Sequence, residues 1–483
     1  MTELENDLQE VTDRREVDLP AGWGELLQPR NLAATTTLCL GVGLFAFNEF
    51  FISTALPTAV GELGGAALLS WALTLYLVFA IVGGMMAADM KRRFGARATL
   101  LASAAVFVAG TLLATTAGSM TEVLAGRLLQ GAGEGVVAAL CYALIPELFP
   151  SRLVPKVFGA EAIVWAVAAF AGPVLAGALT EYWSWRAAFF ISVPAAAIFA
   201  ALVVLIVPRH GSVIRSRSVI PFARLLAAGT AILMISVSGT IDRLLQVAAL
   251  LLAAGVTLVL AVRSDLRSRN PVLPRQAFGL DSPLGAGFWV VVLMPVAHAA
   301  VPVYLVYALQ HLWDLGPTAA GALSASMAVA WSFTAIVVAS LQSRTARHRL
   351  LLAGPGLLAA GIAGLTIASA SGALWLVLPA QIAAGAGFGF SWGTLSQLMM
   401  EMSDDAERER TSAMLPTLQS AGYAIGAAFF GLVANTMGFA EDMPDAVLRT
   451  AMLTVFGGAS LIAAVSIFFG LRMASLARAQ GRF

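Results

Sequence analysis

The chain has 483 residues, of which 59% are hydrophobic and 12% are charged, and its formal net charge at pH 7 is +1. A soluble globular domain carries about 25% charged residues. The composition therefore excludes an ordinary water-soluble protein and favours one whose outer surface faces a lipid bilayer. The near-neutral charge gives no reason to expect a nucleic-acid partner.

The chain begins with a polar, acid-rich segment over residues 1–32. This segment lacks the basic and then apolar layout of a cleavable signal peptide. We therefore expect it to be a cytoplasmic N-terminal tail.

Apolar segments long enough to cross a membrane follow the tail. A transmembrane helix needs roughly 17–25 apolar residues, and segments of that kind fall in a pattern of six, two and six. They lie near 33–57, 66–88, 98–118, 121–147, 157–180 and 187–207, then 223–240 and 243–262, and finally 284–309, 317–341, 350–370, 373–400, 411–436 and 446–471. The middle pair is short and closely spaced. Without it the spans number about twelve instead of about fourteen.

The pattern predicts an all-α integral membrane fold, in which two six-helix bundles are joined by two inserted helices, with about 14 spans in all. The predicted parts are a cytoplasmic N-terminal tail (1–32), an N-terminal six-helix bundle (33–208), a linker with two extra spans (209–283), a C-terminal six-helix bundle (284–474) and a cytoplasmic tail (475–483). In such a duplicated architecture, the substrate path lies between the halves near the membrane midplane.

Basic residues indicate the orientation of these spans independently of hydropathy, because cytoplasmic loops carry an excess of Lys and Arg. With the N-terminus inside, nearly all basic residues fall on inner segments. The exceptions are Arg127 within a span and Arg186, Arg243 and Arg449 on the outer side. We therefore expect a multi-pass protein of the cell inner membrane with both termini in the cytoplasm.

Four short motifs occur on the predicted helices. They are Arg127-Leu-Leu-Gln130-Gly131-Ala-Gly133-Glu134-Gly135, Ala171-Gly172-Pro173-Val-Leu-Ala176-Gly177, Trp185-Arg186-Ala-Ala-Phe189-Phe190-Ile-Ser-Val-Pro194 and Ala55-Leu56-Pro57. The first resembles the RxxQGxGxG signature of the major facilitator superfamily. The others resemble the GPxxGG antiporter motif of its drug exporters, the WRxxFxxxxP run that follows it, and the ALP ending of their first helix. The inserted pair and the Pro271-Val-Leu-Pro274 loop resemble the fourteen-helix drug:proton antiporter branch.

The chain departs from the pattern of the family in three places, one of which is Glu134 inside the glycine run of the helix over 121–147. Asn48, with Glu49 beside it, stands where the branch usually has an aspartate nine residues before the proline. The resemblance also implies a conformational loop after the second span. Its predicted residues are Asp89, Arg93, Gly95 and Arg97. Here Asp89 precedes Gly95 by six residues instead of three.

The helix over 121–147 carries three polar residues on one face, because Arg127, Gln130 and Glu134 follow i, i+3, i+7 spacing. An ionisable group at the bilayer centre costs at least about 2.5–3.5 kcal/mol, so its default interpretation is functional. Seven residues rise about 10 Å along a helix, so Gln130 or a water would bridge Arg127 and Glu134. We expect Arg127 and Glu134 to take part in proton coupling. The alternative is that Arg127 binds carbonyls of a neighbouring helix and only organises the bundle.

Further polar residues lie within the predicted spans. Glu49 and Glu161 are additional candidates for proton coupling, with a plain interfacial carboxylate as the alternative for each. Asn48 and Gln130 are candidates for the substrate path. His298 is a candidate there too and could carry a proton, although a single histidine on an apolar face is more often neutral and hydrogen-bonded.

Gly172 and Pro173, followed by Gly177, predict a hinge. Proline removes a backbone donor and glycine permits close helix contact. Ordinary helix packing is the alternative.

A polar and aromatic stripe is predicted on the helix over 373–400. Its members are Gln381, Gly385, Phe388 and Trp392. Together with Trp165, Trp289 and Trp331, these aromatic rings could enclose a planar ligand. Anchoring at the lipid interface is the alternative for each tryptophan.

No motif for another chemistry is recognisable. The cysteines Cys39 and Cys141 lie in apolar stretches, which argues against a disulfide framework or a Cys-rich metal site. There is no glycine-rich phosphate loop, no histidine pair with metal spacing and no nucleophile–base set. We expect neither an enzyme nor a bound cofactor or metal.

The sequence therefore predicts a secondary transporter that works by alternating access, as a monomer, on a small amphipathic or aromatic molecule, with coupling to protons. Export of drug-like compounds is favoured by the resemblance. The alternative is uptake of a planar vitamin such as riboflavin. A membrane sensor or scaffold is a third possibility, in which loss of Glu134 would leave solute flux unchanged.

Overall fold

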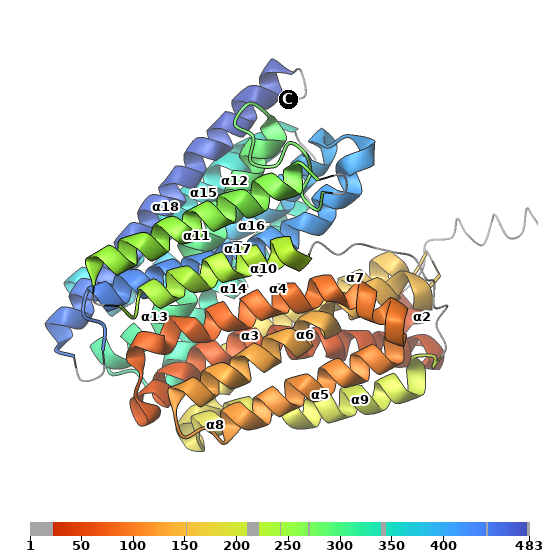
Figure 1. The fold of residues 1–483 in the computed structure, drawn as a ribbon, viewed down its shortest axis with the longest axis horizontal. Coiled ribbons are helices and arrows are strands. Elements are labelled where there is room, and N and C mark those ends of the chain that lie inside the picture. Colours follow the sequence, from red (N-terminus) through yellow and green to blue (C-terminus); the bar gives the residue numbers. More distant parts are fainter. Residues whose placement is uncertain are drawn as a thin grey trace, which may run out of the picture.

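The computed structural model describes residues 23–150, 152–209, 222–241, 243–268, 271–339, 344–440 and 443–480, and within these ranges every regular element is a helix (Figure 1). The predicted N-terminal tail lies outside the described residues as far as residue 22, as does the end of the C-terminal tail from residue 481. The all-α membrane fold expected from the sequence is confirmed.

The helices fall into two bundles and a hairpin between them. The N-terminal bundle comprises α2 (Trp23–Leu26), α3 (Pro29–Leu63), η1 (Ala66–Leu68), α4 (Leu69–Phe94), α5 (Ala96–Thr115), α6 (Met120–Leu148), α7 (Val154–Tyr182), α8 (Trp185–Phe190) and α9 (Ser192–Ile206). The inserted hairpin comprises α10 (Phe222–Ser238) and α11 (Leu244–Leu266). The C-terminal bundle comprises α12 (Pro283–His298), α13 (Ala300–Leu312), α14 (Pro317–Ala339), α15 (Arg344–Ser371), η2 (Leu374–Leu376), α16 (Val377–Met402), α17 (Asp405–Thr436) and α18 (Asp445–Ala479).

Thirteen helical segments in the described residues are long and apolar enough to cross a membrane. Two of them are interrupted, since α8 continues into α9 and α12 into α13. The predicted span at 223–240 is the exception, because its apolar helix covers only Ala223–Ser238 and is shorter than the others. The expected count of about 14 is therefore not confirmed.

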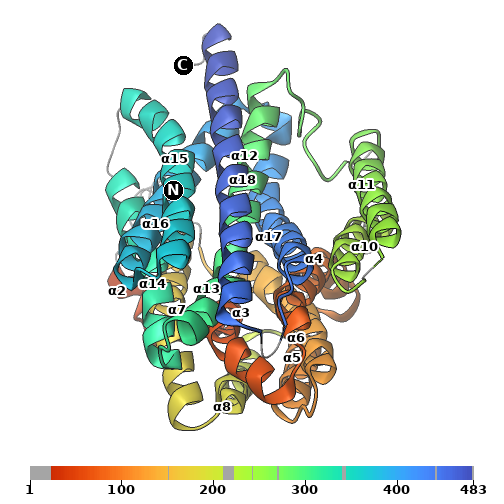
Figure 2. The same cartoon turned by 90° about the vertical axis from the view of Figure 1, so that its left-hand side faces the viewer.

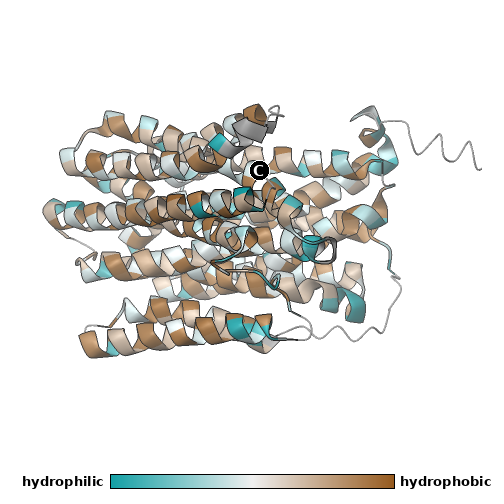
Figure 3. Cartoon of the chain, turned by 90° about the horizontal axis from the view of Figure 1, so that it is seen from above, coloured by the Kyte–Doolittle hydropathy of each residue, from teal (hydrophilic) through white to brown (hydrophobic). Residues whose placement is uncertain are grey.

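Hydrophobic residues predominate along the helices, and hydrophilic residues gather mainly at the helix ends (Figure 3). On α11, for example, Leu244, Leu245 and Leu252 are exposed. Such a surface suits a lipid environment, in which outward-facing side chains can remain apolar.

The two bundles approach each other at one end and diverge toward the end that carries α2 and the C-terminus (Figure 1). We call the diverging end the inner end and the opposite end the outer end, following the predicted orientation. Several hydrogen bonds join the bundles at the outer end. The backbone N–H of Thr318 donates to Glu181 at 3.0 Å, and the Asn435 amide donates to the Ala67 carbonyl at 2.9 Å. The structure is thus closed at its outer end.

The α10–α11 hairpin packs beside α4 and α17, where the two bundles meet (Figure 2). At its inner end Arg224 of α10 pairs with Asp265 of α11, whose carboxylate also accepts backbone N–H bonds from Val272 and Leu273. At its outer end the Gly239 carbonyl accepts a 3.0 Å bond from Asn435 of α17. The hairpin is therefore fastened at both ends.

Candidate functional site

Helix α6 lies between α4 and α5 at very short separation, because glycines face both neighbours. A β-carbon on Gly131 would overlap the carbonyl oxygen of Tyr76, and one on Gly135 would overlap that of Ala80. On the other side, a β-carbon on Gly133 would lie 2.5 Å from the Ser103 carbonyl oxygen. Close backbone contact through glycine is a common mode of packing between membrane helices. It holds the polar side chains of α6 in fixed positions inside the bundle.

Arg127 is wholly buried and bound on three sides. Its Nε donates to the Ala72 carbonyl of α4 at 3.2 Å, and its Nη1 donates to Gln130 Oε1 at 2.8 Å. Its Cζ lies 4.1 Å from the centre of the Tyr76 ring, a cation–π contact. Gln130 in turn donates to Thr111 of α5 at 2.9 Å. Arg127 therefore binds a carbonyl of a neighbouring helix, as in its alternative interpretation. It also contacts the polar network through Gln130 and Tyr76.

Glu134 is 1% exposed, and only one of its carboxylate oxygens is bound. Oε2 accepts 2.8 Å hydrogen bonds from the Asn48 amide of α3 and from the Tyr76 hydroxyl of α4. Oε1 is buried and has no hydrogen-bond partner among the residues that the structure describes. A buried acceptor without a partner is energetically costly, so Oε1 is the position at which a proton or a donor from a ligand would bind.

Tyr76 is the member of this network that the sequence analysis did not identify. It joins Arg127 and Glu134, since its ring face meets the guanidinium and its hydroxyl binds the carboxylate. Of the two expected bridges, Gln130 or a water, Gln130 binds Arg127 but not Glu134, because its amide nitrogen donates to Thr111 of α5. A tyrosine within an apolar span needs a hydrogen-bond partner for its hydroxyl, and that need was the available signal.

Glu49 of α3 extends the network toward the C-terminal bundle. Its half-buried side chain interacts electrostatically with Arg127 and with Tyr423 of α17. Tyr423 and Tyr76 also belong to one small apolar cluster with Ala424 and Ala428. The polar groups of the N-terminal bundle thus approach the other bundle at Tyr423.

Aromatic rings gather on the opposite side of this contact. The edge of the His298 ring meets Phe388, with ring centres 5.3 Å apart, and Tyr423, at 5.8 Å. Phe388 stacks on Trp331 at 5.0 Å. Both ring nitrogens of His298 are buried without a hydrogen-bond partner in the described part of the chain. We call His298, Trp331, Phe388 and Tyr423 the aromatic cluster.

The other aromatic candidates lie elsewhere. Trp165 donates to the Tyr142 hydroxyl within the N-terminal bundle. Trp289 stacks on Phe469 of α18, and Trp392 packs half-buried against the main apolar core. The structure therefore does not bring Trp165 and Trp289 together with the aromatic cluster. Trp392 packs against the same core as Phe388 and Trp331, and its place beside a planar ligand stays a prediction. Gln381 donates to the Ser324 carbonyl of α14 at 3.3 Å.

Glu161 of α7 is buried away from these groups, with both carboxylate oxygens lacking a hydrogen-bond partner among the described residues. A path of rings connects the two regions. Phe45 lies 5.7 Å from Tyr76 and 5.8 Å from Trp165, measured between ring centres, and Trp165 follows Glu161 by one helical turn.

The predicted hinge residues lie where α7 meets α14 of the other bundle. A β-carbon on Gly177 would lie 2.5 Å from the Pro317 carbonyl oxygen. The Pro173 carbonyl in turn contacts Gly321, and Gly172 faces Phe50 of α3. These residues thus form a close contact between the bundles, and their role as a hinge remains a prediction.

The predicted conformational loop is a tight turn between α4 and α5. Asp89 belongs to the last turns of α4 and pairs with Arg92 at 2.7 Å and Arg93 at 2.9 Å within that helix. Gly95 ends α4 with a positive φ of 81°, and Arg97 lies in the first turn of α5. Asp89 thus pairs with basic residues of its own helix, and the role of this segment as a conformational loop stays a prediction.

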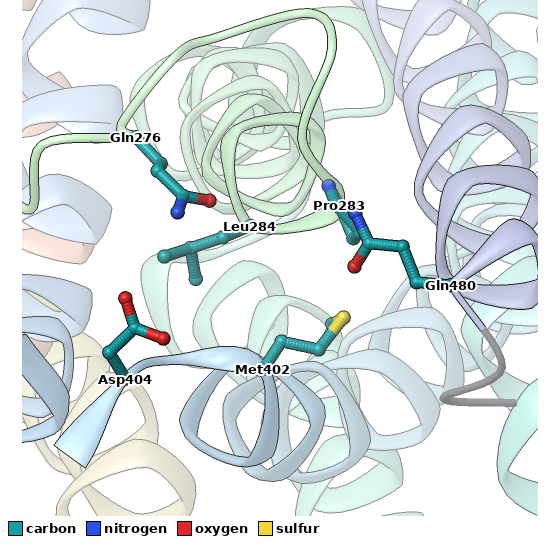
Figure 4. A pocket seen from close by; sticks show the side chains of 6 residues that line it. All are labelled: Gln276, Pro283, Leu284, Met402, Asp404 and Gln480. Atoms are coloured by element: carbon teal, nitrogen blue, oxygen red, sulfur yellow. The ribbon is translucent and has the colours of Figure 1, made fainter.

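A separate cavity of about 410 Å³ opens at the inner end of the C-terminal bundle. Polar groups of Gln276, Asp404 and Gln480 face it together with Pro283, Leu284 and Met402 (Figure 4). Gln276 lies in the loop before α12 and the other residues lie at helix ends, so the cavity is distinct from the buried network. In the described residues, no group of three or more His, Cys, Asp or Glu side chains is placed to hold a metal ion.

Comparisons with known proteins agree with this geometry. A family model described as Major Facilitator Superfamily matches residues 38–427. A probable multidrug-efflux transporter of Mycobacterium tuberculosis is 34% identical over 456 residues, which cover 91% of this chain and 95% of the relative. A solved D-xylose–proton symporter has a TM-score of 0.64 at 17% identity and covers 91% of this chain and 97% of its own. A solved peptide transporter has a TM-score of 0.64 at 14% identity and covers 92% and 95%. Because the sequence identities are low, these two structures support the fold and not a particular function.

Proposed function

The chain belongs to the Major Facilitator Superfamily, and we propose that it exports amphipathic or aromatic organic compounds across the cell inner membrane in exchange for protons. Secondary transport by a multi-pass membrane protein follows from the family, which also agrees with the expectation that the chain is not an enzyme. Export is favoured by the efflux transporter that covers nearly the whole chain at 34% identity. One observation carries the proposal: beside the junction of the two bundles lies a buried carboxylate, one oxygen of which has no hydrogen-bond partner in the part of the chain that the structure describes.

Proton coupling is proposed for Glu134, supported by Arg127. Inside a membrane, an ionisable group is costly and is retained mainly where it serves transport. Glu134 Oε1 has room for a proton, while Oε2 stays bound to Asn48 and Tyr76 in the closed network. When the bundles move apart, water reaches the carboxylate and its protonation changes. Glu49, which interacts electrostatically with Arg127, is the proposed second member.

Substrate binding is proposed for the space between Glu134 and the aromatic cluster. Aromatic faces bind planar molecules with little conformational cost, and pairs of rings prefer stacked or edge-on arrangements. The stacked Phe388 and Trp331 would hold the ring system, while the free nitrogens of His298 would bind a polar group. Asn48 and Gln381 border the same path.

The proposed exchange requires a state that opens at the outer end. In the structure, the contacts of Glu181 with Thr318 and of Asn435 with Ala67 close that end. The close contact between Gly177 and Pro317 lies in the same region. We propose that these contacts break together when the outer end opens. The parts that move are then the two bundles, with the boundaries expected from the sequence. We also propose that α10 crosses the membrane and completes the fourteen-span arrangement of the antiporter branch.

The experiment uses everted membrane vesicles from bacteria that express the full chain. Respiration acidifies the vesicles, and a pH-sensitive dye reports proton release when ethidium is added. We expect ethidium to release protons, and Glu134→Gln to reduce the release to that of vesicles without the protein. Glu122→Gln is the matched control, because Glu122 lies on the same helix but is exposed and bonds only to the Gly118 backbone N–H. Equal activity of Glu134→Gln and Glu122→Gln would refute the coupling role.

Uptake of a planar vitamin such as riboflavin is the second candidate. The stacked Trp331 and Phe388 favour it, because such a pair accommodates a flat ring system whatever the direction of transport. Labelled riboflavin uptake by a riboflavin-requiring bacterium separates the two. If riboflavin uptake occurs and depends on Glu134, the protein is an importer and the export proposal is wrong. If the protein reaches the membrane and no riboflavin uptake occurs, riboflavin is excluded as the substrate.

A further inference from the structure

Glu161 is a second buried carboxylate, and the coupling network of Glu134 does not use it. The side chain is 1% exposed, yet neither carboxylate oxygen has a hydrogen-bond partner in the described part of the chain. The side chains that interact with it electrostatically are Cys39 of α3 and Cys141 and Tyr142 of α6. None of these is a cation. The nearest basic residue on its own helix, Lys156, lies over the ring of Trp23 instead.

Three aromatic residues lie on the same side of α7 as this carboxylate. Phe158, Glu161 and Trp165 follow i, i+3, i+7 spacing and share one face of α7. Tyr142 of α6 spans the same face, since its ring stacks on Phe158 at 6.1 Å and its hydroxyl accepts the Trp165 indole N–H at 3.1 Å. Glu161 lies between the two residues that Tyr142 contacts. We call Tyr142, Phe158 and Trp165, on the face of α7 that carries Glu161, the aromatic enclosure.

The enclosure is accessible at one edge. Phe158 is 45% exposed, and Tyr142 and Trp165 are half-buried, whereas the carboxylate itself is covered. All four residues lie toward the inner end, because α6 ends at Leu148 and α7 begins at Val154. A ligand that arrives at the inner end would therefore meet the rings first and the carboxylate behind them.

The chemistry of this arrangement selects a cation with an organic shell. An isolated buried carboxylate is strongly disfavoured unless it is neutralised or paired. A ring face attracts a cation within about 6 Å of its centre, and a compact inorganic ion would need oxygen ligands that the enclosure lacks. A quaternary or alkyl ammonium, or a phosphonium, satisfies both the rings and the charge.

We propose that Glu161, with the rings of Tyr142, Phe158 and Trp165, forms a binding site for the cationic group of an organic substrate. This inference rests on the proposed export function and names its substrate class. The site is the first that a cationic compound meets from the inner end. The ring contacts of Trp165 with Phe45, and of Phe45 with Tyr76, continue from it to Glu134.

The test measures binding of tetraphenylphosphonium to the purified full-length protein in detergent by calorimetry at pH 8. We expect Glu161→Gln to weaken binding at least about tenfold. Glu147→Gln is the matched control, because Glu147 lies near the inner end of α6, is exposed and pairs with Lys91. We expect Tyr142→Phe to bind within about threefold of the unchanged protein, since it keeps the ring, and Tyr142→Leu to lose about tenfold.

Lowering the pH provides a second measurement that needs no variant. A protonated Glu161 carries no charge to pair with the cation, so binding to the unchanged protein weakens as the pH falls. Binding to Glu161→Gln, which carries no titrating group at this position, varies less with pH. If Glu161→Gln does not fold, this dependence and the two Tyr142 variants still test the site.

The inference is overturned if Glu161→Gln binds tetraphenylphosphonium as tightly as Glu147→Gln, or if Tyr142→Leu binds as tightly as Tyr142→Phe. The vesicle experiment separates this failure from failure of the export proposal. Proton release by a neutral planar dye, without any effect of Glu161→Gln on cation binding, would sink the cation site alone. If cation binding depends on Glu161 but no compound causes proton release, proton-coupled export is refuted and the cation site is retained.

Discussion

Helices α6 and α16 occupy equivalent places in the two bundles, and both are packed between two neighbours by glycines at the same spacing. In α6 the glycines that meet neighbouring carbonyls are Gly131, Gly133 and Gly135. In α16 they are Gly385, Gly387 and Gly389, which meet the carbonyls of Met327, Gly354 and Trp331. Aligned on these glycines, Arg127 corresponds to Gln381 and Glu134 corresponds to Phe388. The backbone arrangement is repeated, but the charged pair is present in one bundle only.

The comparison separates a structural role from a functional one. Arg127 donates to the Ala72 carbonyl of α4, and Gln381 donates to the Ser324 carbonyl of α14, so both fasten their helix to an equivalent neighbour. Helix fastening therefore needs only an amide. The positive charge of Arg127 is additional, and it accompanies Glu134, whereas the corresponding Phe388 belongs to the aromatic cluster. At these equivalent positions, the N-terminal bundle has a charged pair and the C-terminal bundle has an amide and an aromatic ring.

Substitution of the shared glycines should have the largest effect, and it tests whether α6 and α16 pack in the same way. Gly131→Val and Gly385→Val each force side-chain atoms against a carbonyl of the neighbouring helix, and overpacking of this kind costs about 1–3 kcal/mol or more. We expect both variants to lose monodisperse protein in size-exclusion chromatography and to unfold at lower temperature. Gly393→Val is the control on α16, because nothing lies within 4 Å of a β-carbon there. Behaviour of Gly131→Val like that of Gly393→Val would show that the two helices do not share one packing scheme.

Replacing Arg127 by the residue of the other bundle tests the division of roles. Arg127→Gln retains an amide for the Ala72 carbonyl but removes the charge beside Glu134. Hydrogen bonds to charged groups contribute about 1.5–3 kcal/mol, so we expect proton-coupled exchange to fall about 10- to 100-fold while the protein stays folded. Gln381→Ala should reduce exchange far less. If the two variants lose equal activity, the charge has no role of its own.

Tyr76→Phe removes one of the two hydrogen bonds to Glu134 and keeps the ring beneath Arg127. A hydrogen bond to a charged group is worth about 1.5–3 kcal/mol when both partners are present, and Asn48 still binds the same oxygen. We therefore expect proton-coupled exchange to fall by roughly three- to tenfold. The control is Tyr182→Phe, which alters an exposed hydroxyl at the end of α7. An unchanged rate in Tyr76→Phe would place Tyr76 outside the coupling network.

The smallest expected effect concerns the aromatic side of the comparison. Phe388→Leu keeps an apolar group but removes the stack on Trp331, which contributes about 0.5–1.5 kcal/mol. We expect the KM for planar compounds to rise about two- to tenfold, with the maximal rate unchanged. Compounds without a flat ring system serve as the comparison. An equal change for both kinds of compound would argue against stacking with the substrate.

The fold could be predicted from the sequence because the membrane requires long apolar helices, and their order follows directly from hydropathy. The helix interruptions after Phe190 and His298 each lie four residues before a proline, Pro194 and Pro302, which has no backbone N–H to donate to the carbonyl of that residue, so their signal was in the sequence although hydropathy did not use it. Arg127 and Glu134 stand out in sequence because charge is rare within spans. Their placement on opposite sides of Tyr76 depends on the separation and rotation of α4 and α6, which spacing along one helix does not contain.

The positions of the aromatic candidates also could not be predicted from spacing along one helix. Spacing along α16 placed Phe388 and Trp392 on one stripe, but only Phe388 joins the aromatic cluster. Tyr423 was missed because its importance arises from position, between Glu49 of one bundle and His298 of the other. The repeated Gly-Ala-Gly-X-Gly of α6 and α16 was the sequence signal that would have aligned the two bundles and paired Glu134 with Phe388.

The placement of the α10–α11 hairpin makes the two sides of the molecule unequal within the plane of the membrane. The contact of α4 with α17 and the contact of α14 with α7 are related by the repeat, yet the hairpin covers only the first (Figure 2). A compound dissolved in the lipid thus meets an added wall of two helices on one side and the bare α7–α14 contact on the other. The transporter therefore presents two different surfaces to molecules that approach from the lipid.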